Sequence, residues 1–166
     1  MGRGCAAPLR LLFVVLTLAS AYLAAGASAA TRVLHGRNSA VEPARKPGLA
    51  RKVVTFARHQ IGVFYRYGGS SRSTGFDCSG LVYAAYRSVG LEIPRSSWDQ
   101  RRAGRRIGFK QLRPGDLLFT EGGGHVVLVA SSTKAISAPH TGARVSYVPL
   151  RSLRAQFAGA RRLLNS

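Results

Sequence analysis

Apolar residues recur at helical spacing in one stretch of the chain and in short β-branched runs in a later stretch. Across residues 49–61 they fall three or four positions apart, which predicts an amphipathic helix that Gly62 ends. The same spacing predicts a second helix over 77–89, with Asp77 as its N-cap. A shorter polar helix is predicted over about 96–104.

The pattern changes after Pro114-Gly115 to short runs that are typical of strands. The predicted strands are 116–119, 125–130, 134–137 and 144–148. Their connections are short and turn-like, which favours neighbouring antiparallel strands. Helices followed by a block of strands is the order of an α+β domain, with N-terminal helices packed on an antiparallel β-sheet.

The first residues have the pattern of an export signal. Arg3 and Arg10 form a positive start, residues 11–23 are almost entirely apolar, and Ala27-Ser28-Ala29 offers small residues for cleavage. The sequence therefore predicts a signal peptide over 1–29 and a secreted or periplasmic protein. An uncleaved membrane anchor is the alternative, but the run is short for a bilayer span of about 20 residues.

The remaining chain divides into three parts. Residues 30–48 show no apolar periodicity and predict a flexible leader. Residues 49–150 contain all the predicted helices and strands, and we expect them to form the single domain. Residues 151–166 combine arginines with leucines and predict a basic C-terminal tail or a short helix.

The charge is strongly positive. The chain has 25 Lys and Arg against 6 Asp and Glu, a net charge of +19. Such a charge favours an acidic partner, and export makes anionic envelope polymers the expected class through electrostatic contact. No nucleic-acid motif is present, so we expect no nucleic acid partner. A solvated basic surface that keeps the protein soluble is the alternative. We expect a monomer.

Cys78 is the one cysteine that remains after the predicted cleavage. It stands in the first turn of the second predicted helix, where unpaired N–H groups and the helix dipole favour a thiolate. A nucleophilic cysteine is presented in this way. A small buried residue that happens to begin a helix is the alternative.

A nucleophile of this kind needs a base, and three histidines follow the leader. His59 falls on the polar side of the first predicted helix, and His140 lies in a turn. His125 opens an apolar strand directly after three glycines, so its imidazole is both rigidly placed and accessible. It is the expected general base.

With these residues the chain resembles the NlpC-type cell-wall peptidases, a family of papain-like cysteine endopeptidases. The matching segments occur in the family's order and spacing. They are Tyr65-Arg-Tyr-Gly-Gly69, Phe76-Asp-Cys-Ser-Gly-Leu81, Pro94-Arg-Ser96, Pro114-Gly-Asp-Leu117 and Gly124-His-Val126.

The resemblance implies roles for individual residues. Cys78 is the nucleophile and His125 the base, and no metal or cofactor is required. Asp77 and Ser79 match the substrate-contacting pair, and Tyr65 matches the tyrosine near the oxyanion site.

The third catalytic position departs from the family. The family often has a histidine about twelve residues after the base, and this chain has Ser137 there. A hydroxyl holds an imidazole less strongly than a charged partner does, and loss of the orienting group costs up to about ten-thousandfold in a serine-protease template. If its turn folds back, His140 takes the place of Ser137 as the residue that orients His125. Otherwise we expect His140 among the substrate-binding residues.

The resemblance implies an exported cysteine peptidase that hydrolyses peptidoglycan stem peptides at the γ-D-glutamyl–meso-diaminopimelate bond. One alternative is an amidase on the same scaffold. The other is a catalytically weak or degenerate member that binds peptidoglycan, which the serine at position 137 motivates.

Overall fold

The computed structural model describes residues 44–45 and 48–165. The predicted signal peptide and the leader up to residue 43 lie outside the described residues. Within the part of the chain that is described, no helix is long and apolar enough to cross a membrane.

Two of the three predicted helices form close to their predicted bounds. Helix α1 spans Leu49–His59 and α2 spans Cys78–Arg87, and Asp77 caps α2 by accepting a hydrogen bond from the Gly80 N–H. The third helix is shorter than predicted, because α3 covers only Ser97–Gln100. The chain leaves it through Gly104, whose φ of 64° is in the left-handed region, and continues as strand β4.

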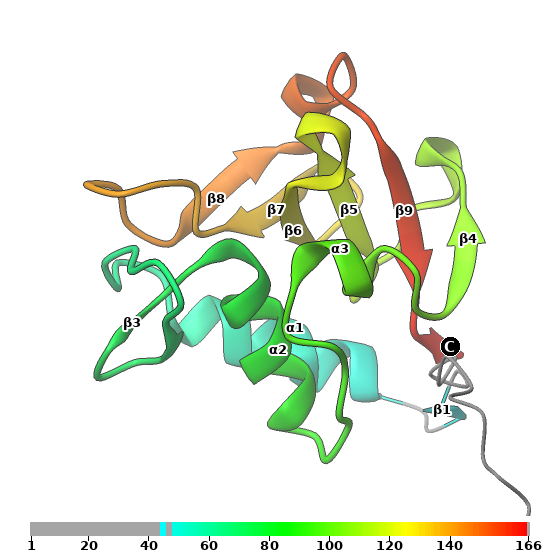
Figure 1. The fold of residues 1–166 in the computed structure, drawn as a ribbon. Coiled ribbons are helices and arrows are strands. Elements are labelled where there is room, and N and C mark those ends of the chain that lie inside the picture. Colours follow the sequence, from blue (N-terminus) through cyan, green and yellow to red (C-terminus); the bar gives the residue numbers. More distant parts are fainter. Residues whose placement is uncertain (1–43, 46–47, 166) are drawn as a thin grey trace, which may run out of the picture. The chain divides into compact units, whose positions relative to one another are not determined.

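Six strands form one sheet in which all pairs are antiparallel, with the order β4-β9-β5-β6-β7-β8. Helices α1 and α2 lie on one side of this sheet, and α3 stands in front of it (Figure 1). The strands are β4 (Arg105–Ile107), β5 (Leu117–Thr120), β6 (His125–Val129), β7 (Lys134–Ser137), β8 (Ser146–Pro149) and β9 (Gly159–Arg162).

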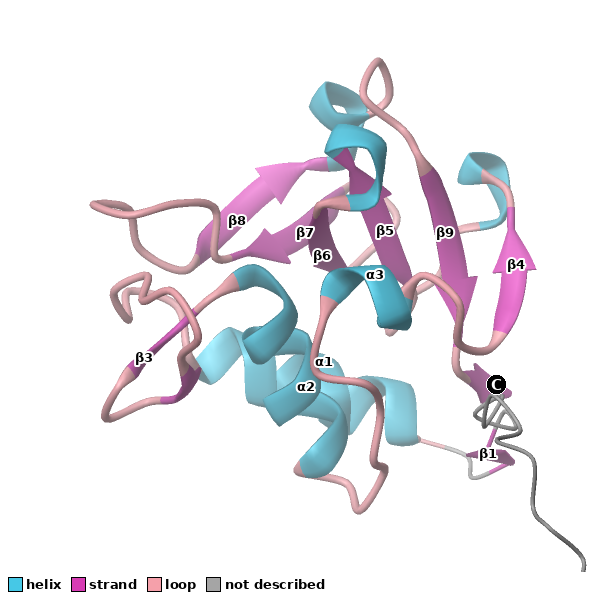
Figure 2. Ribbon diagram, in the orientation of Figure 1, coloured by secondary structure: helices cyan, strands magenta, loops and turns pink. Residues whose placement is uncertain are grey.

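Short elements complete the fold and are visible in Figure 2. They are the strand pairs β1 (Ala44–Arg45) with β10 (Leu164–Asn165) and β2 (Ser70–Ser71) with β3 (Gly75–Phe76), and the 3-10 turns η1 (Phe109–Gln111), η2 (Glu121–Gly123) and η3 (Leu150–Leu153).

The predicted end of the domain at residue 150 is wrong. Strand β9 lies inside the sheet between β4 and β5, so residues 159–162 belong to the domain and are neither tail nor helix. The sequence did not predict this strand because it contains Arg162, and a buried arginine is rare unless it is paired. Here Arg162 Nη2 and Asp116 Oδ2 form an ion pair of 2.7 Å with both side chains almost fully buried.

Both faces of the sheet are covered, which explains why β5 and β6 read as continuous apolar runs. Alternate residues of these strands point to opposite faces. Leu117 and Val126 join the larger core under α1 and α2. Leu118 and Val127 join a smaller core with Leu150 on the other face.

Candidate active site

Cys78 is the first residue of α2, as predicted, and the segment before it is fixed by close backbone packing. A Cβ atom at Gly80 would collide with the Gly69 carbonyl oxygen, so only glycine lets the helix start approach this loop. The Asp77 N–H donates to the same carbonyl at 3.1 Å. The position of Cys78 is therefore set by the loop as well as by its own helix.

A network around Asp77 holds this loop and the helix together. Arg95 Nη2 donates to Asp77 Oδ2 at 2.7 Å and to the Gly69 carbonyl at 3.0 Å. Arg95 Nη1 donates to Ser79 Oγ at 2.9 Å, and Ser79 in turn donates to Asp77 Oδ1 at 3.2 Å. The Gly68 N–H donates to Asp77 Oδ2 at 2.9 Å.

The network keeps the Asp77 carboxylate ionised. Burial by itself would raise the pKa of Asp77, but the hydrogen bonds from Arg95 and the Gly80 N–H outweigh it and hold the pKa below its ordinary value. The polar contacts of Asp77 and Ser79 are made within the protein. Their contact with substrate stays a prediction.

The thiol of Cys78 is in a different electrostatic state from the one predicted. Burial raises its pKa above the ordinary value, and the charge of Asp77 adds to this, although the Val126 N–H lowers it. The thiolate expected at the start of a helix is therefore not the resting form. The Val126 contact also places the thiol beside the residue that follows His125 on β6.

His125 is held by Ser137. The distance between His125 Nε2 and Ser137 Oγ is 3.1 Å, and Ser137 is buried on the neighbouring strand β7. Burial lowers the pKa of His125, so the imidazole is neutral and able to accept a proton. The spacing of twelve residues therefore identified a side chain that contacts this histidine.

His140 does not replace Ser137 in this contact. It is exposed, and its Nδ1 lies 2.9 Å from the Thr141 carbonyl oxygen. It is close enough to His125 for its charge to contribute to the lowered pKa of that residue. The hydrogen bond to the imidazole is made by Ser137, and His140 acts on His125 through its charge.

Tyr65 lies near the thiol. Burial raises the pKa of its phenol, and the charge of Cys78 is the next cause. Its N–H donates to the Ala143 carbonyl at 2.9 Å, which ties the tyrosine to the turn between β7 and β8. The phenol therefore remains protonated and able to donate a hydrogen bond.

A cleft of about 530 Å³ opens at Tyr65 and Cys78, and its wall reaches Gly124, the residue before His125. Its walls include side chains that sequence reasoning did not assign, Arg95 and the half-exposed Trp98. Arg95 lies in one of the segments that match the family. No role could be assigned to it from the sequence, because its partner Asp77 is 18 residues away. The residues lining the cleft are Tyr65, Tyr67, Gly68, Asp77, Cys78, Ser79, Arg95, Ser96, Ser97, Trp98 and Gly124.

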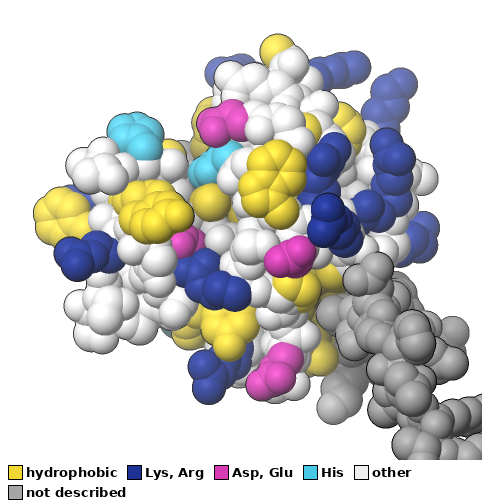
Figure 3. Space-filling model, viewed as in Figure 1, with side chains coloured by type: hydrophobic (Ala, Val, Ile, Leu, Met, Phe, Trp, Pro, Cys, Tyr) yellow, Lys and Arg dark blue, Asp and Glu magenta, His cyan; other side chains and the backbone are white. Residues whose placement is uncertain are grey.

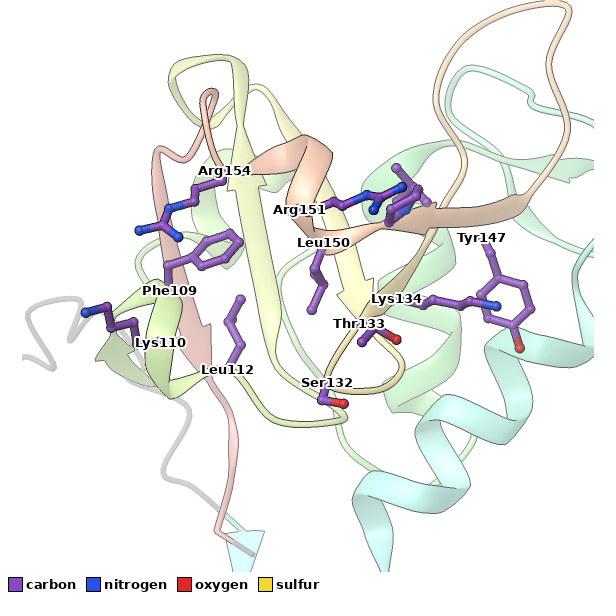
Figure 4. Close-up of a pocket in the computed structure, with 12 residues that line it drawn as sticks. Phe109, Lys110, Leu112, Ser132, Thr133, Lys134, Tyr147, Leu150, Arg151 and Arg154 are labelled. Carbon is purple, nitrogen blue, oxygen red and sulfur yellow. The ribbon is translucent and has the colours of Figure 1, made fainter.

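A larger hollow of about 900 Å³ lies on the other face of the sheet (Figure 4). Phe109 and Leu150 contribute to its apolar floor, and Lys110 and Arg154 stand at its rim. Cys78 is not among the residues that line it. Its size therefore does not make it the catalytic site.

The match to the model of the NlpC/P60 family covers residues 62–162. The chain belongs to the NlpC/P60 family. The matched range includes Cys78, His125 and Ser137 and extends to the end of β9.

Named relatives act on peptidoglycan or carry γ-glutamyl activities. Murein DD-endopeptidase MepH of Escherichia coli (strain K12) is 41% identical over 115 residues, covering 63% of this chain and 42% of MepH. Gamma-D-glutamyl-L-lysine dipeptidyl-peptidase of Bacillus subtilis (strain 168) is 33% identical over 120 residues, covering 69% of this chain and 40% of that protein. The chain thus spans about two fifths of the length of these relatives.

The fold agrees with solved structures of the family. The peptidoglycan hydrolase RipB of Mycobacterium tuberculosis superposes with a TM-score of 0.65 at 34% identity, covering 71% of this chain and 66% of RipB. The NlpC/P60 protein of Bacillus cereus gives the same TM-score at 33% identity, over 70% of this chain and 40% of that one. The α+β, papain-like class predicted from the sequence is confirmed.

Proposed function

We propose that this NlpC/P60 protein is a cysteine peptidase that hydrolyses peptidoglycan stem peptides. One observation carries the proposal. Cys78 begins a helix beside the Val126 N–H, and the residue before Val126 on that strand is His125, whose Nε2 lies 3.1 Å from Ser137 Oγ. Membership of a family with peptidoglycan endopeptidases among its members supports the substrate class.

The reaction begins with a neutral thiol and a neutral imidazole. With the Nε2–H of His125 donating to Ser137 Oγ, Nδ1 is the basic nitrogen. It takes the proton as Cys78 Sγ attacks the scissile carbonyl carbon and the carbonyl electron pair moves to oxygen. The carbon–nitrogen bond then breaks, and His125 returns the proton to the leaving amine.

Water completes the cycle. It attacks the thioester carbonyl while His125 accepts one of its protons. The carbon–sulfur bond then breaks, His125 returns the proton to the sulfur to restore the thiol, and the acid product leaves as a carboxylate after losing its proton to solvent. The oxyanion in both halves accepts hydrogen bonds from the Cys78 N–H and the Tyr65 hydroxyl. The raised pKa of Tyr65 favours this donor role.

The bond proposed is the γ-D-glutamyl–meso-diaminopimelate bond. The two Bacillus relatives named for γ-D-glutamyl-L-lysine activity support a γ-D-glutamyl residue on the acyl side. A second candidate is the D,D cross-link between stem peptides, which the 41% identity to MepH favours. We also propose that the protein acts after export, since peptidoglycan lies outside the cytoplasm.

The test compares two proteins expressed from the complete sequence, the unchanged protein and its Cys78→Ala variant. Each is incubated with a muropeptide carrying a tetrapeptide stem and with the D,D-cross-linked dimer, and the products are weighed by mass spectrometry. Release of a diaminopimelyl-D-alanine dipeptide by the unchanged protein alone, which leaves L-alanyl-γ-D-glutamate on the muramoyl group, supports the proposed bond. Conversion of dimer to intact monomers supports the D,D alternative.

Other outcomes distinguish the remaining hypotheses, an amidase and a peptidoglycan-binding protein. A free stem peptide that begins with L-alanine indicates an amidase. Cleavage by the Cys78→Ala variant at the unchanged rate overturns the proposed nucleophile. Intact substrates with both proteins, together with retention on peptidoglycan, indicate a binding protein.

A further inference from the structure

A second, smaller hollow lies beside the catalytic cleft. It has a volume of about 260 Å³ and is lined by four arginines, one tryptophan and residues 158–160 at the start of β9. Basic side chains gather over β4 and β9 on the face shown in Figure 3. We call this hollow the arginine groove, and its charged members are Arg101, Arg102, Arg106 and Arg161.

The positive charge of the arginine groove is almost uncompensated. Among the described residues, the one acid paired with these arginines is Asp99, which lies 3.6 Å from Arg102 with both side chains well exposed. The pKa of Arg161 is lowered by burial and then by the charges of Arg106 and Arg101. Such a cluster of like charges favours an anion strongly.

Two of the arginines are fixed in place by the protein itself. Arg101 Nη2 donates to the Ala158 carbonyl at 2.8 Å, and Arg161 Nε donates to the Arg101 carbonyl. A Cβ atom at Gly123 would lie 2.8 Å from Arg101 Cδ, so the glycine leaves room for this side chain. Arg102 and Arg106 are exposed and able to reach a ligand.

The arginine groove and the catalytic cleft are neighbours through Trp98. Its side chain lines both hollows. Gly123, which accommodates Arg101, is followed by Gly124 of the cleft wall and then by His125. A chain lying across Cys78 can therefore continue past the indole into the groove.

We propose that the arginine groove is an outer subsite of the catalytic cleft that binds free carboxylates of the substrate peptide. The proposal rests on the proposed function for its substrate. A stem peptide carries carboxylates at its γ-linked glutamate, its diaminopimelate and its C-terminus, and each loses its charge when it is amidated. Guanidinium groups pair with carboxylates through parallel hydrogen bonds, and an indole covers the aliphatic parts between them.

The sequence contains one tryptophan, so fluorescence reports directly on the junction of cleft and groove. The Cys78→Ala protein, expressed from its complete sequence, is titrated with a stem tetrapeptide and with its fully amidated form. The same titrations use two further variants with equal loss of charge. Arg102→Gln/Arg106→Gln alters the groove, and Arg51→Gln/Arg58→Gln alters exposed positions on α1.

We expect the carboxylate form to bind about threefold to thirtyfold more tightly than the amide form, and this ratio to fall as salt is raised. The groove variant should reduce the ratio to below about twofold, while the α1 variant should keep it. The proposal is overturned if the groove variant keeps the ratio. It is also overturned if both variants lose it equally, because the cause is then the charge of the whole molecule.

The binding measurement is independent of turnover. If the carboxylate preference depends on Arg102 and Arg106 but the unchanged protein cleaves nothing, the subsite stands and the proposed peptidase activity fails. If the unchanged protein cleaves both peptide forms with equal kcat/KM and the Cys78→Ala protein binds them equally, the peptidase activity stands and the subsite fails.

Discussion

At the scale of single residues, the orienting group of the candidate base is a neutral hydroxyl. A hydrogen bond between neutral groups is worth about 0.5–1.5 kcal/mol net, which is less than a charged partner supplies. We therefore expect Ser137→Ala to lower kcat about threefold to tenfold with little change in KM. Steady-state kinetics on a defined stem peptide measure this. A fall beyond about a thousandfold would show that the serine does more than orient His125.

Introducing a charge at the same position tests the direction of the pKa argument. In Ser137→Asp the new carboxylate stabilises the imidazolium, so the pKa of His125 rises and the acid limb of the kcat/KM profile moves to higher pH. In the unchanged protein burial lowers this pKa, so the acid limb lies below about pH 6.5. Equal acid limbs in both proteins would contradict the assignment of His125 as base.

The buried thiol leads to a separate prediction about its reactivity. Alkylation requires the thiolate, and burial raises the pKa of Cys78. Iodoacetamide should therefore modify Cys78 more slowly at pH 7 than it modifies free cysteine, with a midpoint at a higher pH than that of free cysteine. Mass spectrometry of the alkylated protein over a pH series measures the rate. Slow alkylation does not indicate a degenerate site, because the proposed reaction starts from the neutral pair.

Local signals in the sequence were sufficient for some of these residues but not for others. The Asp77 cap and the placement of Cys78 depend on neighbours within three positions, so the helix pattern revealed them. Ser137 required the family spacing. Arg95 and Trp98 could not be placed, because their surroundings are formed by segments 18 or more residues away. The neutral state of Cys78 depends on burial, which one sequence does not reveal.

At the scale of elements, Arg95 joins the segment before α3 to the loop before α2. Its guanidinium is 36% exposed and its partner Asp77 12% exposed, so solvent reduces the strength of the pair. We expect Arg95→Gln to lower the free energy of unfolding by about 1–3 kcal/mol, as measured by urea denaturation. Arg87→Gln, at the exposed end of α2, is the matched control and should change it by less than about 0.5 kcal/mol.

The same substitution should change the acid stability of the protein. The folded pKa of Asp77 is lowered, so its contribution to stability is present above about pH 3.9 and is lost as the pH falls through the folded value. Without Arg95 the folded pKa rises, and half-unfolding should occur at a higher pH. Circular dichroism during acid titration detects this shift, and an unchanged midpoint would contradict it.

Strand β9 makes the domain depend on its last residues. It pairs with both β4 and β5, and its Arg162 compensates the buried Asp116. A chain that ends at Leu150 should therefore lose cooperative thermal unfolding, whereas a chain that ends at Asn165 should keep it. Removing one member of a buried ion pair costs about 3–5 kcal/mol, so Arg162→Gln should lower stability by a similar amount.

At the scale of the whole molecule, a net charge of +19 should produce attraction at a distance. We expect binding to isolated cell walls to weaken as the salt concentration rises from about 0.1 M to 1 M, since the Debye length falls from about 10 Å to 3 Å. Sedimentation with wall fragments measures the bound fraction. Binding that does not change with salt would indicate that the stem peptide alone holds the protein.

The pairing of β1 with β10 has a consequence for how this domain can be combined with others. Ala44–Arg45 run parallel to Leu164–Asn165, so the described unit begins and finishes at the same place (Figure 1). A unit with adjacent ends can be inserted into a host protein, or joined end to end and reopened at an exposed turn, with little strain. The domain can therefore be transferred into another protein as one unit, and a circular permutant opened between Ser132 and Thr133 should fold.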